Sequence, residues 1–597
     1  MHYNIEDIYK LVYTKKDGFM ATIQSKTSRG HKYWYIVQSK RVNGKPRPIV
    51  LAYLGKADGL LKRLKGITSG IRLKSYSHGG VGALLKIASE LDIVTIINKY
   101  IESKRHYRPK KPMSNSLTAG ITLLLAAIGR VCMPTSKRGW QSWAKTTTLQ
   151  YLLRCSLSRL DSQHFWDLMD ALPVDNIPKV EADILANVFK IYSIESDSLF
   201  FDTTNFFTYI DSTNIRSTIA KRGRNKHKRH DLRQIGLAMV VTKADMIPLF
   251  HLTYDGNITD TVVFGKIIQK VKERLKKLGL DLGRHTIVFD RGNNSKRNLA
   301  IIEKLKLFYV GALTPYQHKK LIEEATTCNF KEINTGGSIL KFYRDKKVIW
   351  GQERTVVVFI SSKLKAGRIR GIYQSIKKIE KNLEELKVSL ASPGAKKRDR
   401  GKLEEKIVGM VKGQYIKNII NWSLGEVSPG RFILKFAVDY KLLKKIEDDL
   451  GFRIIMTNRH NWSTASIIEA YHGQSKIESA FKNLKNPYHL TIKPQFHWTD
   501  HNVEVHMFIC VLGYLLAAIA WRRAKAAGFN TTLDTLLDTL NNIRLATMLE
   551  DSKAPGAVKA IYKLEEMSDD ESALMEALKI KDLHNKRLKI SGVGIYN

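Results

Sequence analysis

Alternating apolar and polar residues near the amino terminus predict β-strands. The runs KYWYIVQSK and RPIVLAYLG follow this two-residue period, and the Asn43-Gly44 pair between them is typical of a hairpin turn. We therefore expect residues 1–75 to form a β-rich N-terminal module.

Between residues 76 and 195 the apolar residues recur at helical spacing instead. The segments GALLKIASELDIVTIINKYI and LTAGITLLLAAIGRV each predict a helix with a broad apolar face. Lys137, Arg138 and Lys145 are scattered between the helices. This pattern is typical of a helical DNA-end-binding domain and equally of a plain helical core, and both interpretations stay open.

Strands and helices alternate over residues 196–320, which predicts an α/β sheet. The alternation stops in residues 321–460, where short β runs flank a charged helical segment from about residue 366 to 418. Pro393-Gly394 divides that segment, so we expect a helical hairpin within an inserted domain.

Residues 461–530 return to helices, one from about Thr464 to Leu484 and an apolar one from Val505 to Trp521. The apolar helix is slightly short for a membrane span and begins beside Glu504, so a buried core helix is favoured over a transmembrane segment. We expect no membrane partner. Residues 531–597 predict a charged helical tail.

The charge of the chain narrows its function. The 597 residues include 99 Lys and Arg against 56 Asp and Glu, a formal net charge of +43. A polyanion is the natural partner, and nucleic acid is favoured over the reading of a merely lysine-rich soluble protein.

The number and spacing of the cysteines indicate the redox state of the protein's cellular compartment. The four cysteines lie far apart without a C-x-x-C pair, which favours neither a zinc ribbon nor a disulfide framework and indicates a reducing environment. The first residues lack the continuous apolar core of a signal peptide, so we expect a cytoplasmic location.

Two aspartates stand directly after apolar strand runs. Asp202 follows Leu199-Phe200-Phe201, and Asp290 follows Ile287-Val288-Phe289. Each by itself is typical of a turn or a helix cap. On two strands of one α/β sheet, however, the two carboxylates can converge where open sheets bind ligands.

A third acidic residue lies in the predicted helix YHGQSKIESAFKNLK. With about 100° of rotation per residue, one arc of about 60° contains Tyr471, Gln474, Glu478 and Lys485, beside an apolar stripe. An ordinary amphipathic helix with solvated charges shows the same pattern.

Together, the motifs FFDTTN, VFDRGNNS and Y-x2-Q-x3-E-x6-K resemble the DDE transposases of bacterial insertion sequences, in the branch with a Y-x2-R-x3-E-x6-K signature and a β-rich insertion before the glutamate. The segments GRNKHKRHDLRQIGLAMVV, PLFHLTYDGN and NGKPRPIVLAYLG extend the resemblance over roughly residues 35–525. It implies an α/β fold with an RNase H-like core in two parts, 196–320 and 461–530, the second carrying the catalytic glutamate. A β-rich plus helical-hairpin insertion domain would interrupt this core, after the N-terminal β-rich and helical domains.

The resemblance also implies the chemistry. Asp202, Asp290 and Glu478 would be the catalytic residues and the ligands of two Mg²⁺ ions, for which Mn²⁺ can substitute. Tyr471 and Lys485 would hold the phosphate beside the cleaved bond. The enzyme would bind the terminal inverted repeats of its element, hydrolyse each end and join the 3′-hydroxyl ends to target DNA. It would act as a homodimer on double-stranded DNA, in the nucleoid of a prokaryotic cytoplasm.

The expected DNA contacts depart from the signature at one position. Gln474 stands where the signature has Arg, so a bidentate charge-assisted contact to a phosphate is lost. His230 likewise stands where relatives often have Pro. The segment Lys221–Arg233 has seven Lys or Arg in 13 residues and would track the DNA backbone or form a solvated hairpin. The predicted DNA-binding residues are Tyr471, Gln474, Lys485, Lys482, Arg291, Arg222, Arg224, Lys228, Arg229 and Arg233.

Aromatic residues of the inserted segment could receive a flipped base, as relatives do at the transposon end, although core packing is favoured for each of Trp350, Trp422 and Phe452. The HWTDH motif does not favour a zinc protease, because Trp498 stands where such a motif would need a glutamate. Two other functions stay open: a transposase descendant that acts as a DNA-binding regulator, and an RNase H-like nuclease without strand transfer.

Overall fold

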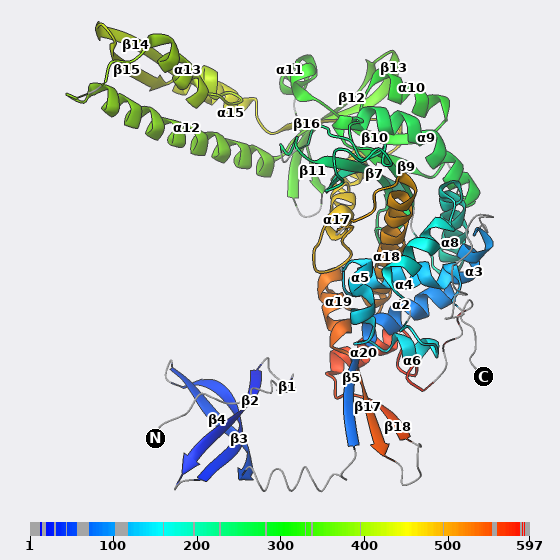
Figure 1. Cartoon of the computed structure of the whole chain (residues 1–597). Helices are drawn as coiled ribbons and strands as arrows, with labels where there is room; N and C mark the ends of the chain where they lie inside the picture. Colours follow the sequence, from blue (N-terminus) through cyan, green and yellow to red (C-terminus); the bar gives the residue numbers. More distant parts are fainter. Residues whose placement is uncertain are drawn as a thin grey trace. The chain divides into compact units, whose positions relative to one another are not determined.

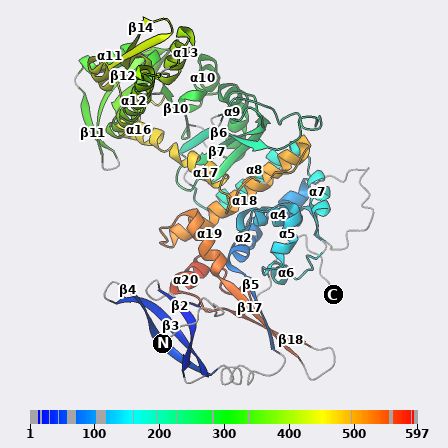
Figure 2. The ribbon, with the colours of Figure 1, turned by 60° about the vertical axis from the view of Figure 1, so that its left-hand side comes forward.

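The chain divides into two compact units. Figure 1 and Figure 2 show its helices and strands. The helical unit comprises Met1–Ile191, Tyr209–Thr218 and Lys482–Asn597, and the sheet unit comprises Tyr192–Thr208 and Ile219–Phe481. The computed structural model describes residues 12–14, 19–28, 31–42, 45–56, 71–101, 117–158, 160–194, 197–225, 228–280, 283–328, 330–335, 338–394, 396–493, 495–551, 558–585, 588 and 590. The Asn43-Gly44 turn lies outside these residues.

A nine-stranded sheet is the centre of the sheet unit, in the order β11-β12-β13-β16-β10-β9-β6-β7-β8. β9 pairs in parallel with β6 and with β10, whereas all the other neighbouring strands of this sheet are antiparallel. The strands are β6 (Ser198–Thr208), β7 (Arg233–Thr242), β8 (Pro248–Asp255), β9 (Thr286–Phe289), β10 (Phe308–Leu313), β11 (Lys331–Thr335), β12 (Ser338–Ile349), β13 (Gln352–Ile360) and β16 (Phe452–Thr457).

The part of the sheet from β8 to β10 fits an RNase H-like core. β6, β7 and β8 form an antiparallel meander, and β9 and β10 are added in parallel on the other side of β6. The inner strands β7 and β9 are buried almost throughout, which is why their sequences are nearly continuous apolar runs. The predicted α/β class is confirmed as a mixed sheet flanked by helices.

Four strands from residues 321–460 extend this same sheet. The chain leaves the sheet after β13 and returns to it as β16. This strand pairs with β13 on one side and with β10 on the other. The inserted segment is therefore hydrogen-bonded into the core sheet through its strands, and only the part between Ile360 and Phe452 stands outside it.

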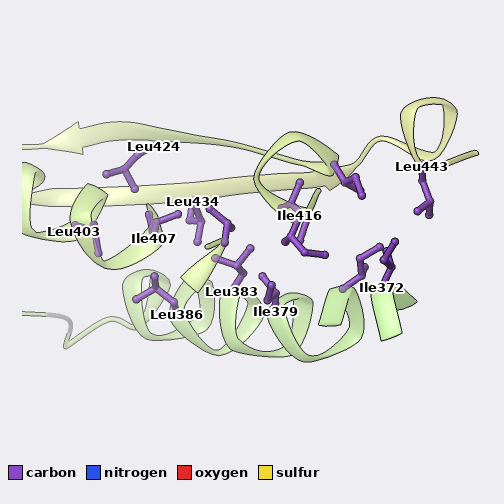
Figure 3. Packing of buried hydrophobic residues seen from close by; sticks show 14 of the residues in the cluster. Ile372, Ile379, Leu383, Leu386, Leu403, Ile407, Ile416, Leu424, Leu434 and Leu443 are labelled. Carbon is purple, nitrogen blue, oxygen red and sulfur yellow. The ribbon is translucent and has the colours of Figure 1, made fainter. Parts of the chain in front are cut away.

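That outer part has a hydrophobic core of its own (Figure 3). A stripe of α12 that recurs every three or four residues, including Ile379, Leu383 and Leu386, packs against α13 and β15. Pro393 and Gly394 lie between α12 and α13, where the hairpin was expected. The elements are α12 (Ser362–Ala391), α13 (Arg400–Met410), α14 (Ile416–Ile419), β14 (Ile420–Ser428), β15 (Arg431–Val438) and α15 (Tyr440–Asp448).

Shorter helices complete the sheet unit. Side-chain caps begin several of them; the Ser295 hydroxyl, for example, accepts from the backbone N–H of Asn298. These helices are α9 (Asp260–Lys277), α10 (Lys296–Lys304), α11 (Lys319–Thr327), α16 (Thr464–His472) and α17 (Ser475–Asn483), the last of which runs into the helical unit.

The helical unit is built around α18 (Asp500–Ala526). By length and hydropathy α18 could cross a membrane, as could α4 (Ala119–Cys132) and α5 (Lys137–Ala144) taken as one span bent by 81°. However, 94% of the apolar window of α18 is buried inside the protein, as expected of a core helix. Its other helices are α2 (Gly79–Glu90), α3 (Ile93–Lys99), α6 (Leu149–Leu153), α7 (Ser162–Asp170), α8 (Ile177–Ile191), α19 (Leu533–Asn542) and α20 (Asp569–Ala577).

Two small sheets also belong to this unit. The N-terminal strands form an antiparallel sheet in the order β1-β2-β3-β4, and a second sheet has the order β18-β17-β5. The C-terminal tail, expected to be helical, thus contains two strands, because β17 pairs with the distant β5. The strands are β1 (Val12–Thr14), β2 (Phe19–Ser28), β3 (His31–Val42), β4 (Lys45–Lys56), β5 (Ile71–Ser77), β17 (Arg544–Asp551) and β18 (Val558–Leu564).

The separate hydrophobic core between Ile360 and Phe452 leads to a prediction about stability. Leu383→Ala removes a fully buried side chain and is expected to cost about 2–5 kcal/mol, because the cavity left behind can collapse only partly. Hydrogen exchange of the α12 and β15 amides in the full chain should accelerate. Val388→Ala is the control on the same helix, since Val388 is 61% exposed. Equal exchange in both variants would contradict a separate core.

Candidate active site

The pairing of β6 with β9 places two carboxylates side by side. Phe201 is opposite Phe289 in this parallel pair, and Asp202 and Asp290 are the next residues on the two chains. Asp290 keeps an extended backbone, with φ −75° and ψ 162°. Adjacent strands lie about 4.8 Å apart and residues in register point to the same face, so both carboxylates project from one face of the sheet at neighbouring positions.

Aromatic packing fixes which face that is. Phe264 of α9 contacts Phe201 with a ring-centroid distance of 4.9 Å and Phe289 with one of 4.7 Å. Side chains alternate along a strand, so α9 covers the face opposite to the acids. Asp202 and Asp290 therefore share the other face with Phe200.

On that face the chain passes close to Phe200 at Gly473. A Cβ on Gly473 would lie 2.4 Å from the Phe200 ring, which only a residue without a side chain permits. The predicted continuous helix from Thr464 to Leu484 is wrong here, because α16 ends at His472 and α17 begins at Ser475. The break brings the start of α17, and with it Glu478, onto the face that carries the aspartates.

A cavity of about 350 Å³ opens at this place. It brings together two acids of the predicted triad, Asp290 and Glu478, while Asp202 is adjacent to Asp290 in the sheet without lining the cavity. Its lining residues are Asp290, Arg291, Ala312, Leu313, Pro315, Leu364, Arg368, Phe452, Arg453, Ile454, Tyr471, His472, Gln474, Ser475 and Glu478.

Three of the predicted DNA-binding residues also line this cavity: Tyr471, Gln474 and Arg291. Tyr471 and Gln474 are buried, with 7% and 9% of their surface exposed, whereas Arg291 is exposed. The cavity lining includes Tyr471, Gln474 and Glu478, although the helix is interrupted between them, and does not include Lys485 from the same predicted helical face.

Two cations of the cavity were not anticipated. Arg453 comes from β16 and Arg368 from the exposed side of α12. Arg453 lies in an ordinary apolar strand run, FRIIMTN, and no local pattern marks it. Only the return of β16 between β13 and β10 brings it to the acids.

Tyr471 lies near both Asp290 and Arg453 in this cavity. Arg453 Nη1 donates to the Tyr471 hydroxyl at 3.1 Å. Burial raises the pKa of Tyr471 and the Asp290 carboxylate raises it further, whereas Arg453 and Arg291 lower it. The phenol therefore stays protonated and able to donate a hydrogen bond at neutral pH.

The acids do not form a preassembled metal site. Among the residues that the structure describes, no group of three or more His, Cys, Asp or Glu side chains is close enough together to hold an ion. The donor set itself fits hard divalent cations, which take carboxylate oxygens and retain water. Asp290 is half-buried and Glu478 is exposed.

The remaining predicted contacts lie elsewhere. Lys482 and Lys485 are exposed and belong to the helical unit, and Lys485 follows the end of α17. In the described part of the basic segment, Arg229 forms an ion pair with Asp231 at 2.6 Å. Arg222, Arg224 and Lys228 are exposed, and Arg233 begins β7. Their contacts with DNA stay predictions.

The three candidate base-receiving aromatics have different surroundings. Trp422 packs against the core of the outer part of the inserted segment, and Trp350 contacts His318 with a centroid distance of 6.5 Å. Phe452 alone of the three lines the cavity with Asp290 and Glu478.

Comparison with known proteins gives one family match and a distant structural similarity. The family model of the transposase DDE domain matches residues 207–516, a span that includes Asp290 and Glu478 and begins after Asp202. Among solved structures, the chain is similar to the piggyBac transposase synaptic complex with hairpin DNA, with 11% identity, a TM-score of 0.34 and coverage of 77% of this chain and 79% of that one. No curated protein matches.

The contact between Gly473 and Phe200 can be tested by substitution. Gly473→Ala is expected to destabilise the sheet unit by about 1–3 kcal/mol, because the new methyl group overlaps the Phe200 ring. Its backbone, with φ −60°, would accept alanine. The thermal midpoint in calorimetry should fall and should recover in Gly473→Ala/Phe200→Leu. Gly371→Ala in α12, with open space around it, should leave the midpoint unchanged or raise it.

Proposed function

The chain belongs to the transposase DDE domain family, as its motifs predicted, and we propose that it binds the terminal inverted repeats of an insertion sequence, hydrolyses the ends and transfers the 3′-hydroxyl ends to target DNA. One observation carries the proposal. Asp202 and Asp290 each directly follow the last pair of the parallel strands β6 and β9, Phe201 and Phe289, and Asp290 lines the same cavity as Glu478.

Members of this family use divalent metal ions, and the three acids are the residues of this chain that would hold them. We propose Mg²⁺, with Mn²⁺ as a substitute, and two ions per site. When bound, such ions activate the attacking oxygen and stabilise the leaving oxygen of a phosphodiester. Asp202 and Asp290, which follow the paired residues Phe201 and Phe289, would hold the ions together with Glu478.

The other cavity residues would position the DNA. Tyr471 donates its hydroxyl proton to a phosphate oxygen, and its raised pKa keeps that proton in place. Gln474 offers a neutral amide, and Arg291 offers a charge at the rim. The ring of Phe452 is the best placed of the candidate aromatics to stack on an unpaired base beside the acids.

The proposed partners follow from the reaction. Two transposon ends must be joined to one target, so a homodimer on double-stranded DNA is proposed, in the nucleoid of a prokaryotic cytoplasm. Lys485, Lys482 and the basic segment around Arg222, Arg224, Lys228, Arg229 and Arg233 would contact the phosphate backbone. The net charge of +43 supports a DNA partner.

The proposal predicts strand cleavage that depends on each acid. Purified full-length protein with Mg²⁺ should nick end-containing DNA and join the freed 3′-hydroxyl to a second duplex. Asp202→Asn, Asp290→Asn and Glu478→Gln should each lower product by more than about 100-fold, since even outer partners of metal ligands are worth about 10- to 100-fold. Glu273→Gln, an exposed position on α9, is the control.

Product analysis separates the alternatives. Nicking without joined product would indicate a nuclease, and tight end binding without any nicking in Mg²⁺ or Mn²⁺ would indicate a regulator. Undiminished activity in the Asp202→Asn variant would show that Asp202 is not a catalytic residue.

A further inference from the structure

The helical unit contains a second large opening, which we call the basic groove, of about 1050 Å³. It lies between the β18-β17-β5 sheet and the helices α5 and α6. Its lining residues are Lys74, Tyr76, Ala144, Lys145, Thr147, Thr148, Gln150, Tyr151, Arg154, Cys155, Ser156, Ser158, Leu545, Thr547, Leu549 and Tyr562.

One face of the small sheet forms the floor. Strand register places Lys74 opposite Thr547 and Thr547 opposite Tyr562, so these three side chains form a row across the sheet. Side chains at every second position share a face, which is why Tyr76 and Leu549 line the same groove. The sequence gives no hint of this floor, because β5 and β17 are more than 450 residues apart in the chain.

The wall is held rigidly around Tyr151. Its ring contacts the Tyr562 ring at a centroid distance of 4.1 Å and the Arg154 guanidinium at 4.2 Å, and its hydroxyl donates to the backbone oxygen of His584. Arg154 ends α6 in the left-handed conformation, with φ 53°. This turn leads the chain directly into Ser156 and Ser158, which continue the wall.

The charged residues in the described lining of the basic groove are all positive. Lys74, Lys145 and Arg154 are exposed, and the described residues that line the groove include no acidic one. Within the described ranges, none of these three cations forms an ion pair with a carboxylate. Three cations converging without a counter-charge repel each other unless a polyanion lies among them.

We propose that the basic groove binds DNA through its phosphate backbone, and this inference rests on the proposed function for its choice of polyanion. The cations come from the floor, the end of α5 and the end of α6, so their charges suit successive phosphates rather than one small anion. Ser156, Ser158 and Gln150 add neutral donors for phosphate oxygens.

The salt dependence of DNA binding tests the groove. Lys74→Gln/Lys145→Gln/Arg154→Gln in the full chain should weaken binding of end-containing duplex, measured by fluorescence anisotropy. The slope of log K against log salt should fall by about 2 to 3, at about 0.9 per lost phosphate contact. The control Arg370→Gln/Lys377→Gln/Lys381→Gln removes the same charge from exposed positions on α12.

Equal losses in both triple variants would mean that only net charge matters and would overturn the proposal, as would an unchanged slope. Strand cleavage by wild type is measured separately. If only the groove variant loses DNA binding and the wild-type protein never cleaves DNA, the groove binds DNA and the proposed function is rejected. If the wild-type protein cleaves DNA and the groove variant binds it unchanged, the proposed function stands and the groove proposal is rejected.

A second and independent inference concerns the catalytic cavity. Gln474 occupies the position at which the signature has an arginine. The guanidinium of Arg453, a residue of β16, lines the same cavity. Arg453 Nη1 is 3.1 Å from the Tyr471 hydroxyl, and its guanidinium carbon is 5.6 Å from the centre of the Tyr471 ring.

Most of the hydrogen-bonding capacity of Arg453 remains available. A guanidinium has five N–H donors, and the described residues include one hydrogen-bond partner of its side chain, Tyr471, and no carboxylate within ion-pair distance. Strand register holds the residue firmly: Arg453 is opposite Phe359 of β13, and Ile454 is opposite Leu313 of β10. The free donors belong to a half-buried side chain that lines the cavity.

We infer that Arg453 supplies the charge-assisted phosphate contact that the signature assigns to position 474. This inference rests on the proposed function. Tyr471 and Arg453 form one donor pair, in which the arginine both orients the phenol and binds the phosphate.

Moving the guanidinium tests this inference. Arg453→Gln should lower strand cleavage by about 10- to 100-fold, the equivalent of one hydrogen bond to a charged group. Arg453→Gln/Gln474→Arg should recover at least tenfold of that loss, because it returns a guanidinium to the same cavity from α17's side. Thermal midpoints check that each variant is folded.

Tyr471→Phe separates binding from orientation. If Arg453 acted only by holding the phenol, Tyr471→Phe would match Arg453→Gln and Gln474→Arg would rescue nothing, which would overturn the inference. Affinity for end-containing DNA in Ca²⁺ is a readout independent of cleavage. Loss and rescue of affinity in a chain without cleavage would keep the Arg453 contact and reject the proposed function.

Discussion

The register between β6 and β9 is the constraint on which the catalytic geometry depends. Phe201 and Phe289 are opposite each other and both pack on Phe264 of α9, so the next residues, Asp202 and Asp290, are neighbours on the other face. A slip of one residue would turn one acid toward α9, because side chains alternate between faces. The aromatic cluster therefore fixes the register, and the register fixes the distance between the carboxylates.

A second contact brings in the third acid. Gly473 lies against Phe200, on the face of the sheet that also carries Asp202, and interrupts the helical segment there. The interruption directs α17 so that Glu478 shares a cavity with Asp290. The glutamate is exposed, whereas both aspartates are half-buried.

The inserted segment contributes residues to the candidate active-site cavity. Its outer part is stable through its own core around Leu383 and Leu434, but its last strand, β16, is hydrogen-bonded between β13 and β10. This return delivers Phe452 and Arg453 to the cavity, and α12 adds Arg368. The described lining of this cavity thus contains three arginines, Arg291, Arg368 and Arg453, beside the two acids Asp290 and Glu478.

The sequence by itself determined the elements whose signals are local. Apolar runs located β6 and β9 and the acids that follow them, Pro393-Gly394 located the hairpin between α12 and α13, and the long apolar run located α18. Motif order added the family, which the domain match confirmed. These features depend on residues close together in the chain, so periodicity and turn chemistry suffice.

Only the tertiary structure decided the features that join distant segments. No local pattern distinguishes Arg453 from other strand residues, marks the break at Gly473 or pairs β5 with β17. Each depends on which strand lies beside which, and that choice is set by packing across the sheet. The three acids could therefore be predicted from the sequence, whereas Arg453 and Arg368 could be placed beside them only from the tertiary structure.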